Sequence, residues 1–417
     1  MDREALVYMD IAGTPVLVGR LWSRIRKHRE TGTFEYDASW LKRADRLALE
    51  PALILSEGPY HTGADRPMFG AIGDSAPDRW GRALMRRAER RVAEREGRQS
   101  RTLFEMDFLL QVDDEARAGA LRFAEKKGGP FLAEADKFRI PPIVELNRLL
   151  AAAERVIDDK DSEEDLRLLI APGSSLGGAR PKASVRDKDG HLSIAKFPHK
   201  EDSSNVVLWE GVALTLAARA RIAVSEWHVV QVAKKACLIL RRFDRRDGER
   251  VPLLSAMSML GAADNEAHTY LEIVEALRQQ GASPNEDLKE LWRRIVFNVL
   301  ISNTDDHLRN HAFLYENQKG WRLSPAYDMN PVPVDVKPRI LTTAIDPEDD
   351  SASMGLAFAA AEYFGLQKAE AKTIAAEVGA AVGQWRQEAQ KAGISKAEID
   401  RMASAFEHED LKKAQAA

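Results

Sequence analysis

The sequence predicts an α+β fold, with strands and helices mixed in the first half of the chain and mainly helices beyond about residue 205. Three observations predict it. Residues 5–22 hold two strand-like runs around a turn at Gly13, the pattern of a β-hairpin. A second hairpin signal, Asp189-Gly190, separates the strand-like segments 183–186 and 191–197. Beyond about residue 205, apolar residues recur mainly at helical spacing.

Size and charge narrow the class of protein. The 417 residues, 44% of them hydrophobic, are enough for two or three structural units with a sizeable core. The 61 basic and 65 acidic residues nearly balance, which argues against a chain built throughout to coat nucleic acid or an anionic membrane.

Cysteine usage and the lack of targeting signals indicate the compartment. The single cysteine, Cys237, stands in an apolar run, so we expect a buried thiol in a reducing compartment. Neither a secretory signal nor a long apolar span is visible. The expectation is a soluble cytoplasmic protein with no membrane partner.

Breaks in composition divide the chain. Residues 125–143 combine Gly128-Gly129-Pro130 with Pro141-Pro142 and indicate a connection between units. This break predicts that a first domain ends near residue 125 and that a second begins near residue 140.

A helix is expected after Pro77-Asp78, and residues 79–101 contain nine arginines. Two interpretations stay open for this arginine-rich helix. It is either a solvated face or a surface for DNA or a protein partner.

A glycine- and serine-rich loop, residues 173–182, precedes the second hairpin. Small residues let the backbone approach a ligand, and consecutive N–H groups can form a nest for anionic oxygens. Arg180 and Lys182 add positive charge. The loop lacks the spacing of a P-loop, and an ordinary turn is the alternative interpretation.

The strand after this loop bears Lys196. A glycine-rich loop, a strand, a turn and a strand with a lysine follow one another in the N-lobe of protein kinases, where the lysine reaches the α/β-phosphates of ATP. Glu210, beside the apolar stripe of the next helix, is the candidate partner of that lysine. The alternatives are a solvent-exposed lysine and an exposed glutamate.

The strongest cluster is residues 303–310. Asp305 is followed five positions later by Asn310, the arrangement of a kinase catalytic loop. There the aspartate accepts or orients the proton of the substrate hydroxyl, and the asparagine oxygen binds a metal ion. Asp306 and His307 add polar groups that are costly to bury without a ligand. A polar helix cap and a plain surface loop are the alternatives.

A third cluster ends in Asp328, which follows a short strand 23 residues beyond Asp305. Magnesium bound to nucleotide phosphates uses one or two carboxylates and other oxygen ligands. Asp328 and Asn310 supply such a set, although an aspartate at the end of a strand is often only structural.

Together these segments resemble the HipA family of serine/threonine kinase toxins. Order and spacing carry the resemblance across residues 174–182, 195–198, 242–245, 303–310 and 324–328. The N-terminal region is also similar to the family's accessory subdomain, in residues 16–22 and 69–82.

The resemblance implies a two-lobed, protein-kinase-like fold. It has an accessory N-terminal subdomain in residues 1–125, a mixed N-lobe in 140–240 and a mainly helical C-lobe in 241–417. ATP and Mg²⁺ would bind between the lobes, with Asp305 as the catalytic base and Asn310 and Asp328 as metal ligands. Arg241 to Phe243 would form the hinge facing adenine. The implied ATP-binding residues are Gly177, Gly178, Ala179, Arg180, Lys182, Lys196, Arg241, Arg242, Phe243, His307, Asn310 and Asp328.

The resemblance also implies partners and regulation. The substrate would be an aminoacyl-tRNA synthetase, whose phosphorylation halts translation and slows growth. A small helix-turn-helix antitoxin, HipB-like, would neutralise the kinase and bring it to operator DNA. Ser175 would be autophosphorylated, with Ser174 as the alternative acceptor.

Two other functions stay open. One is a metal-dependent phosphoesterase or nuclease that uses Asp305, Asp306 and His307. The other is a kinase-fold binding module that acts mainly as an antitoxin-bound co-repressor.

Overall fold

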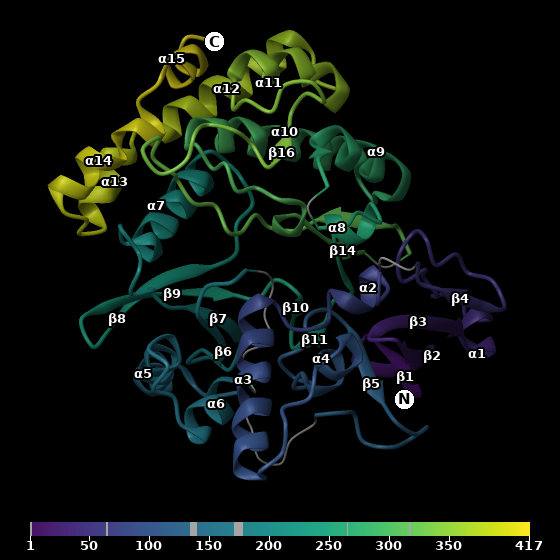
Figure 1. Cartoon of the computed structure of the whole chain (residues 1–417). Coiled ribbons are helices and arrows are strands. Elements are labelled where there is room, and N and C mark those ends of the chain that lie inside the picture. Colours follow the sequence, from purple (N-terminus) through teal and green to yellow (C-terminus); the bar gives the residue numbers. More distant parts are fainter. Residues whose placement is uncertain (1, 64–65, 134–139, 171–177, 265, 317) are drawn as a thin grey trace. The chain divides into compact units, whose positions relative to one another are not determined.

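The computed structural model describes residues 2–63, 66–133, 140–170, 178–264, 266–316 and 318–417. The chain forms two compact units. The first holds Met1–Glu201 and Val230–Leu254, and the second holds Asp202–Val229 and Ser255–Ala417. Helices and strands are mixed in the first, and helices predominate in the second (Figure 1). The three domains predicted from the sequence divide the chain more finely and stay a prediction. Within the described ranges, no helix is long and apolar enough to cross a membrane.

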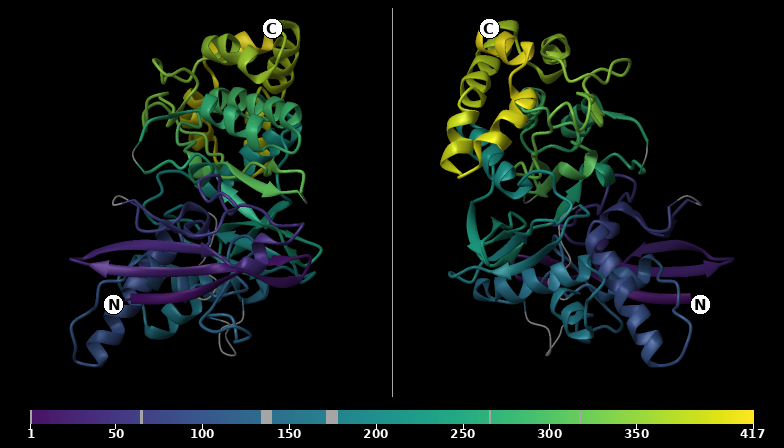
Figure 2. Two further views of the ribbon diagram at one scale, coloured as in Figure 1. Left: turned by 90° about the vertical axis from the view of Figure 1, so that its right-hand side faces the viewer. Right: turned by 60° about the vertical axis from the view of Figure 1, so that its left-hand side comes forward.

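A five-stranded antiparallel sheet, in the order β4-β3-β2-β1-β5, begins the first unit (Figure 2). The hairpin predicted at residues 5–22 is its centre. Ala12 and Gly13 join β1 to β2, and both have positive φ, as tight hairpin turns require. The elements of this region are β1 (Asp2–Ile11), β2 (Thr14–Arg26), β3 (Arg29–Tyr36), α1 (Ala38–Leu41), β4 (Pro59–His61), α2 (Gly70–Gly73), α3 (Arg79–Arg95), α4 (Glu105–Gln111) and β5 (Leu121–Ala124).

A second sheet, in the order β6-β7-β9-β8, contains the predicted lysine strand. Strands β6 and β7 form the predicted hairpin, and β9 pairs with the other edge of β7. Helices α3, α5 and α6 cover one face, where Ala183, Ala195 and Ile239 enter a buried core. Cys237 lies in this core as expected, and burial raises the pKa of its thiol to about 12. The elements are η1 (Ile143–Glu145), α5 (Leu146–Ile157), α6 (Glu163–Ile170), β6 (Lys182–Arg186), β7 (Leu192–Lys196), β8 (Trp227–Val232), β9 (Lys235–Arg241), β10 (Arg245–Arg246) and β11 (Glu249–Arg250).

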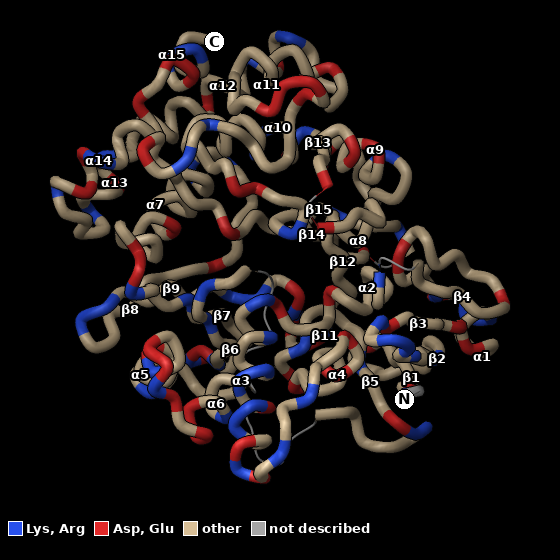
Figure 3. The backbone as a smooth tube through the Cα atoms, viewed as in Figure 1, with Lys and Arg blue, Asp and Glu red and all other residues tan. Residues whose placement is uncertain are grey.

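Helix α3 is the predicted arginine-rich helix, and several of its arginines pair within the first unit. Arg82 forms two bonds to Glu105, at 2.5 and 2.7 Å, and Arg87 pairs with Asp161 at 2.7 Å. Figure 3 marks the basic residues of α3 and the acidic ones near α6. The arginine-rich face is therefore partly an internal interface, which neither open interpretation anticipated. Exposed arginines of α3 include Arg79, Arg86 and Arg90.

The second unit is built around the buried helix α10, which leads directly into the segment 303–310. The hairpin of β14 and β15 follows that segment. β12 (Leu253–Ser255) lies at the point after which the rest of the chain belongs to the second unit. The other elements are α7 (Val206–Arg219), α8 (Ala256–Met259), β13 (His268–Thr269), α9 (Tyr270–Gln280), α10 (Pro284–Leu300), η2 (Leu308–Asn310), β14 (Ala312–Tyr315), β15 (Trp321–Leu323), β16 (Thr343–Ala344), α11 (Met354–Ala360), η3 (Ala361–Phe364), α12 (Lys368–Val382), α13 (Trp385–Lys391), α14 (Lys396–Phe406) and α15 (Glu409–Gln415).

Candidate functional site

The glycine-rich loop is described only from Gly178 onward. Ser174, Ser175 and Gly177 lie outside the described residues. Gly178 has a φ of +95°, a conformation that residues with a side chain rarely adopt. Ala179 and Arg180 follow it and are exposed, so the end of the loop presents backbone and one positive side chain.

Lys182 and Lys196 face each other in the register of β6 and β7. Directly opposite residues of an antiparallel pair project to the same side of the sheet. Their neighbours Ala183 and Ala195 enter the core beneath the helices, so both lysines lie on the other face. Lys196 is partly exposed there, whereas Lys182 is only 3% exposed. The Lys182 ammonium pairs with Asp78 at 3.0 Å.

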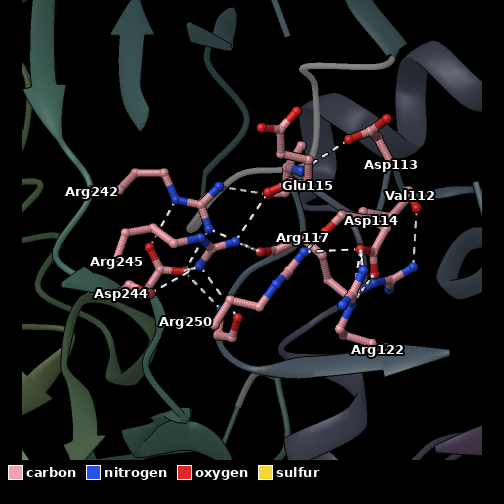
Figure 4. Close-up of polar contacts among 12 residues, drawn as sticks. Val112, Asp113, Asp114, Glu115, Arg117, Arg122, Arg242, Asp244, Arg245 and Arg250 are labelled. Atoms are coloured by element: carbon pink, nitrogen blue, oxygen red, sulfur yellow. Dashed lines mark hydrogen bonds and ion pairs between the residues drawn. The ribbon is translucent and has the colours of Figure 1, made fainter. Parts of the chain in front are cut away.

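The predicted hinge, Arg241–Phe243, begins at the last residue of β9. The Arg242 side chain is buried and donates to Asp244 at 2.5 and 2.8 Å. It also donates to the backbone carbonyls of Ala116 and Arg117, at 2.6 and 3.0 Å (Figure 4). Its guanidinium is thus used inside the protein, so a nucleotide contact at residue 242 would run through the backbone.

Asp244 is the centre of a buried ion-pair cluster, the Asp244 cluster, made of Arg242, Asp244 and Arg245 (Figure 4). It also accepts from the backbone N–H of Gly119, at 2.7 Å. Burial alone would raise the pKa of its carboxyl, but Arg242 and Arg245 hold that pKa well below the usual range. The cluster fixes the end of β9 to the segment that leads into β5.

Two adjacent aspartates of the second unit differ in their surroundings. Asp306 is 4% exposed, and its Oδ2 accepts from Tyr270 Oη at 2.5 Å and from Asn298 Nδ2 at 2.8 Å. His311 Nε2 lies 2.8 Å from the same oxygen. Burial would raise the pKa of Asp306, but His311 and the hydrogen bond from Tyr270 lower it. Asp306 therefore anchors the loop as a buried carboxylate.

Asp305, by contrast, turns its side chain outward and is 73% exposed. Lys337 Nζ lies 3.7 Å from its carboxylate. Its backbone carbonyl accepts from the Asn310 side-chain nitrogen at 3.1 Å and from the His307 N–H at 3.0 Å. Hydrogen bonds to the Asp305 carbonyl thus hold the loop backbone, while the Asp305 carboxylate stays accessible.

The hairpin of β14 and β15 brings Asn310 and Asp328 to one end. Ser324 N–H bonds to the Ala312 carbonyl, so the start of β14 lies beside the chain that leaves β15. Tyr327 Oη donates to the Arg309 carbonyl at 2.7 Å, which ties the residue before Asp328 to the residue before Asn310.

Asp328 itself has a positive φ, +59°. Aspartate adopts this conformation more readily than most residues, but it is uncommon and often marks functional sites. Asn310 is 5% exposed and uses its amide nitrogen within the loop, so its amide oxygen is the atom that could hold a metal. A carboxylate and an amide oxygen are ligands that Mg²⁺ accepts.

Glu210 lies on α7 and is 3% exposed, so the exposed-glutamate interpretation is wrong. Its pairing with Lys196 stays a prediction. His307 is half-buried, and its carbonyl accepts from Asn310 N–H at 2.8 Å.

Asp78 and Asp244 had no predicted role, and Asp306 had one only in the phosphoesterase or nuclease alternative, yet all three hold this geometry together. Proline followed by aspartate before a helix is an N-cap signal, so the capping role of Asp78 was visible in the sequence. Its contact with Lys182, 104 residues away, was not.

Curated relatives of the chain share the name "Putative kinase". That of Sinorhizobium fredii, Y4mE, is 26% identical over 336 residues, 73% of this chain and 72% of the relative. That of Haemophilus influenzae is 28% identical over 196 residues, 42% of this chain and 56% of the relative.

Among solved structures, the chain is similar to one from the HipA, HipB and operator DNA complex of Shewanella oneidensis MR-1. The TM-score is 0.67 over 99% of this chain and 96% of that one, at 16% identity. This likeness confirms the predicted kinase-like α+β fold. Residues 174–385, which are 212 of the 417 positions, match the family described as the HipA-like C-terminal domain. The predicted membership is confirmed: the chain belongs to the HipA-like C-terminal domain family.

Proposed function

We propose that the protein is a serine/threonine protein kinase that uses ATP and Mg²⁺. The loop 303–310 carries the proposal. It presents the exposed carboxylate of Asp305 on a backbone anchored by the buried Asp306. Asn310 and Asp328 accompany it, joined through the bond from Tyr327 to Arg309. Phosphoryl transfer needs such a set, with one carboxylate for the substrate hydroxyl and oxygen ligands for the metal.

In the proposed reaction, Asp305 accepts the proton of a serine or threonine hydroxyl. The hydroxyl oxygen forms a bond to the γ-phosphorus as the bond to ADP breaks. Asn310 and Asp328 would hold Mg²⁺, which when bound neutralises charge on the phosphate oxygens. Lys337 adds a positive charge beside the base.

The first unit would supply the nucleotide-binding groups. Lys196 is partly exposed on the sheet face opposite to the helices, as a phosphate-binding lysine must be. Gly178 to Arg180, together with Gly177, would cover the phosphates, and the backbone of Arg241–Phe243 would face adenine. A contact of His307 with ATP, a place for Lys182 in the nucleotide site beside the loop, and the partnership of Glu210 with Lys196 belong to the same proposal.

A phosphoesterase or nuclease with Asp305, Asp306 and His307 as its metal ligands has less support. The Oδ2 of Asp306 already accepts two hydrogen bonds and lies within bonding distance of His311. The residue is 4% exposed, so it serves the loop and not a metal that faces substrate.

The biological role that we propose is that of a toxin. Its substrate would be an aminoacyl-tRNA synthetase, and Ser175 or Ser174 would be autophosphorylated. The Shewanella protein of similar fold was solved with HipB and operator DNA, which supports an antitoxin partner that brings this chain to DNA. A binding module that mainly co-represses an operon is the alternative proposal.

Purified protein with ATP labelled in the γ-phosphate tests the proposal directly. A kinase transfers label to protein, on itself or on an added synthetase. A phosphoesterase releases labelled phosphate without labelling protein, and a pure binding module does neither.

Removal of the Asp328 carboxylate should weaken binding of ATP with Mg²⁺. A ligand at a hundredfold excess over its dissociation constant stabilises the folded state by roughly 2.7 kcal/mol, so the parent should show a clear rise in melting temperature. That rise should shrink in Asp328→Ala. The neighbouring Asn330→Ala serves as the matched control. An equal rise in parent and Asp328→Ala would remove Asp328 from the metal site.

Exposed arginines of α3 should matter for DNA binding of the antitoxin complex. Neutralising Arg79, Arg86 and Arg90 should lower operator affinity, and the salt dependence should flatten by about one unit per lost phosphate contact. Arg82 is the matched control because its charge is already neutralised by an ion pair with Glu105. Binding that is unchanged at several salt concentrations would assign these arginines to a solvated face.

A further inference from the structure

Lys182 lies where β6, β7 and the end of the glycine-rich loop meet. It is the first residue of β6, it faces Lys196 on β7, and its ammonium lies close to Gly178 of the loop. A β-carbon at Gly178 would come within 2.9 Å of the Lys182 Nζ. Residue 178 therefore lies close to this ammonium, and its φ of +95° is a conformation that glycine adopts readily.

Asp78 holds that ammonium from the start of helix α3. As the N-cap residue, it accepts from the Gly81 N–H through Oδ1, at 2.8 Å. Its Oδ2 pairs with Lys182 Nζ at 3.0 Å, and both side chains are at most 4% exposed. With one oxygen used by the helix and the other by the lysine, the carboxylate is fixed in orientation.

Trp80 adds a second contact between the same two elements. Its Nε1 donates to the Lys182 carbonyl at 3.0 Å, and its ring is buried in the core beneath the sheet. The first turn of α3 therefore holds both the side chain and the backbone of Lys182.

The charges on this sheet face explain why an acid is needed there. Two lysines directly opposite each other repel, and a buried ammonium without a counter-charge is costly. Asp78 neutralises Lys182 locally.

We propose that Asp78 is a positioning residue of the nucleotide site. Through Lys182 it fixes the Gly178 end of the glycine-rich loop, so Lys182 acts on the nucleotide through the loop and not by binding phosphate itself. This inference rests on the proposed function. It also makes helix α3, from the N-terminal part of the chain, a component of ATP binding.

Asp78→Asn tests the role without removing the helix cap, since asparagine caps helices as well as aspartate does. We expect the KM for ATP to rise about tenfold, with kcat at saturating ATP retained, because a loosely held loop binds phosphate less well. Lys182→Met should have the same effect. The double variant should be no weaker than either single one, because both changes break one contact.

Equal or improved ATP affinity in Asp78→Asn would overturn the proposal. If Lys182 itself binds phosphate, Asp78→Asn releases its ammonium and ATP affinity stays equal or improves, while Lys182→Met still weakens it. Asp37→Asn, at the partly exposed N-cap of α1, is the matched control and should leave the KM unchanged. Melting temperatures without ATP show whether each variant is folded, and Lys182→Arg replaces Lys182→Met if the latter is not.

Failure of this inference can be separated from failure of the proposed function. If the parent protein binds no ATP, or if Lys196→Met binds it normally, the kinase assignment fails. If Lys196→Met loses ATP while Asp78→Asn keeps the parent KM, only the role of Asp78 is overturned.

Discussion

Replacing Asp305 by asparagine should remove most phosphate transfer and leave the fold and ATP binding intact. The Asp305 side chain is 73% exposed and its nearby charged group is Lys337 at 3.7 Å, so little structure depends on its charge. A positioned base commonly contributes roughly 10²–10⁴-fold to the rate. The measurement is the initial rate of label transfer from ATP at saturating nucleotide, together with the melting temperature of each protein.

Asp306→Asn is the comparison variant, because the loss of its carboxylate should lower the stability of the fold, which Asp305→Asn should not do. Its buried carboxylate accepts from Tyr270 and Asn298 and faces His311. Breaking a buried charged contact of this kind costs roughly 3–5 kcal/mol of stability. An Asp305→Asn protein that transfers phosphate as fast as the parent, or that melts as early as Asp306→Asn, would contradict our assignment.

Loss of the Asp244 charge should be among the most destabilising single changes in the first unit. Asp244→Asn leaves the buried Arg242 and Arg245 without their counter-charge, at a cost of roughly 3–5 kcal/mol. Because the folded-state pKa of Asp244 is depressed, its contribution is present above the ordinary carboxyl pKa. That contribution is lost as the pH falls towards the folded-state pKa. Urea unfolding near neutral pH measures the difference.

Asp247→Asn provides the comparison for this experiment. Asp247 is exposed in the turn between β10 and β11 and has a positive φ that asparagine also adopts. Its replacement should change stability by no more than about 0.5 kcal/mol. Equal midpoints for the two variants would mean that the Asp244 cluster does not stabilise the unit.

Turn and capping signals in the sequence predicted the elements whose formation depends on residues close together in the chain. The turn at Gly13, the hairpin around Asp189-Gly190 and the helix after Pro77-Asp78 each follow from turn and capping chemistry within a few residues. The structure contains all three. Membership of the family could be predicted for a different reason, because several short motifs occur along the chain in the family's order and spacing.

Long-range pairings were not predictable in the same way. The arginines of residues 79–101 and the acids of residues 158–165 were both visible, yet nothing local indicates that Arg87 pairs with Asp161. The two adjacent aspartates at 305 and 306 also look alike in the sequence. Only the packing of α9 and α10, which bring Tyr270 and Asn298 to Asp306, distinguishes the anchor from the exposed carboxylate.

The path of the chain through the two units affects how a nascent protein can assemble on the ribosome. Strand β7, which carries Lys196, is translated before β9, its partner along one edge. Between them come α7 and the start of β8, residues that belong to the second unit. Until β9 emerges, β7 has an open edge that can pair with another chain. The first unit therefore cannot close as soon as Glu201 is made, although N-terminal units commonly fold first during synthesis. The growing chain is thus most open to misassembly before β9 has been translated.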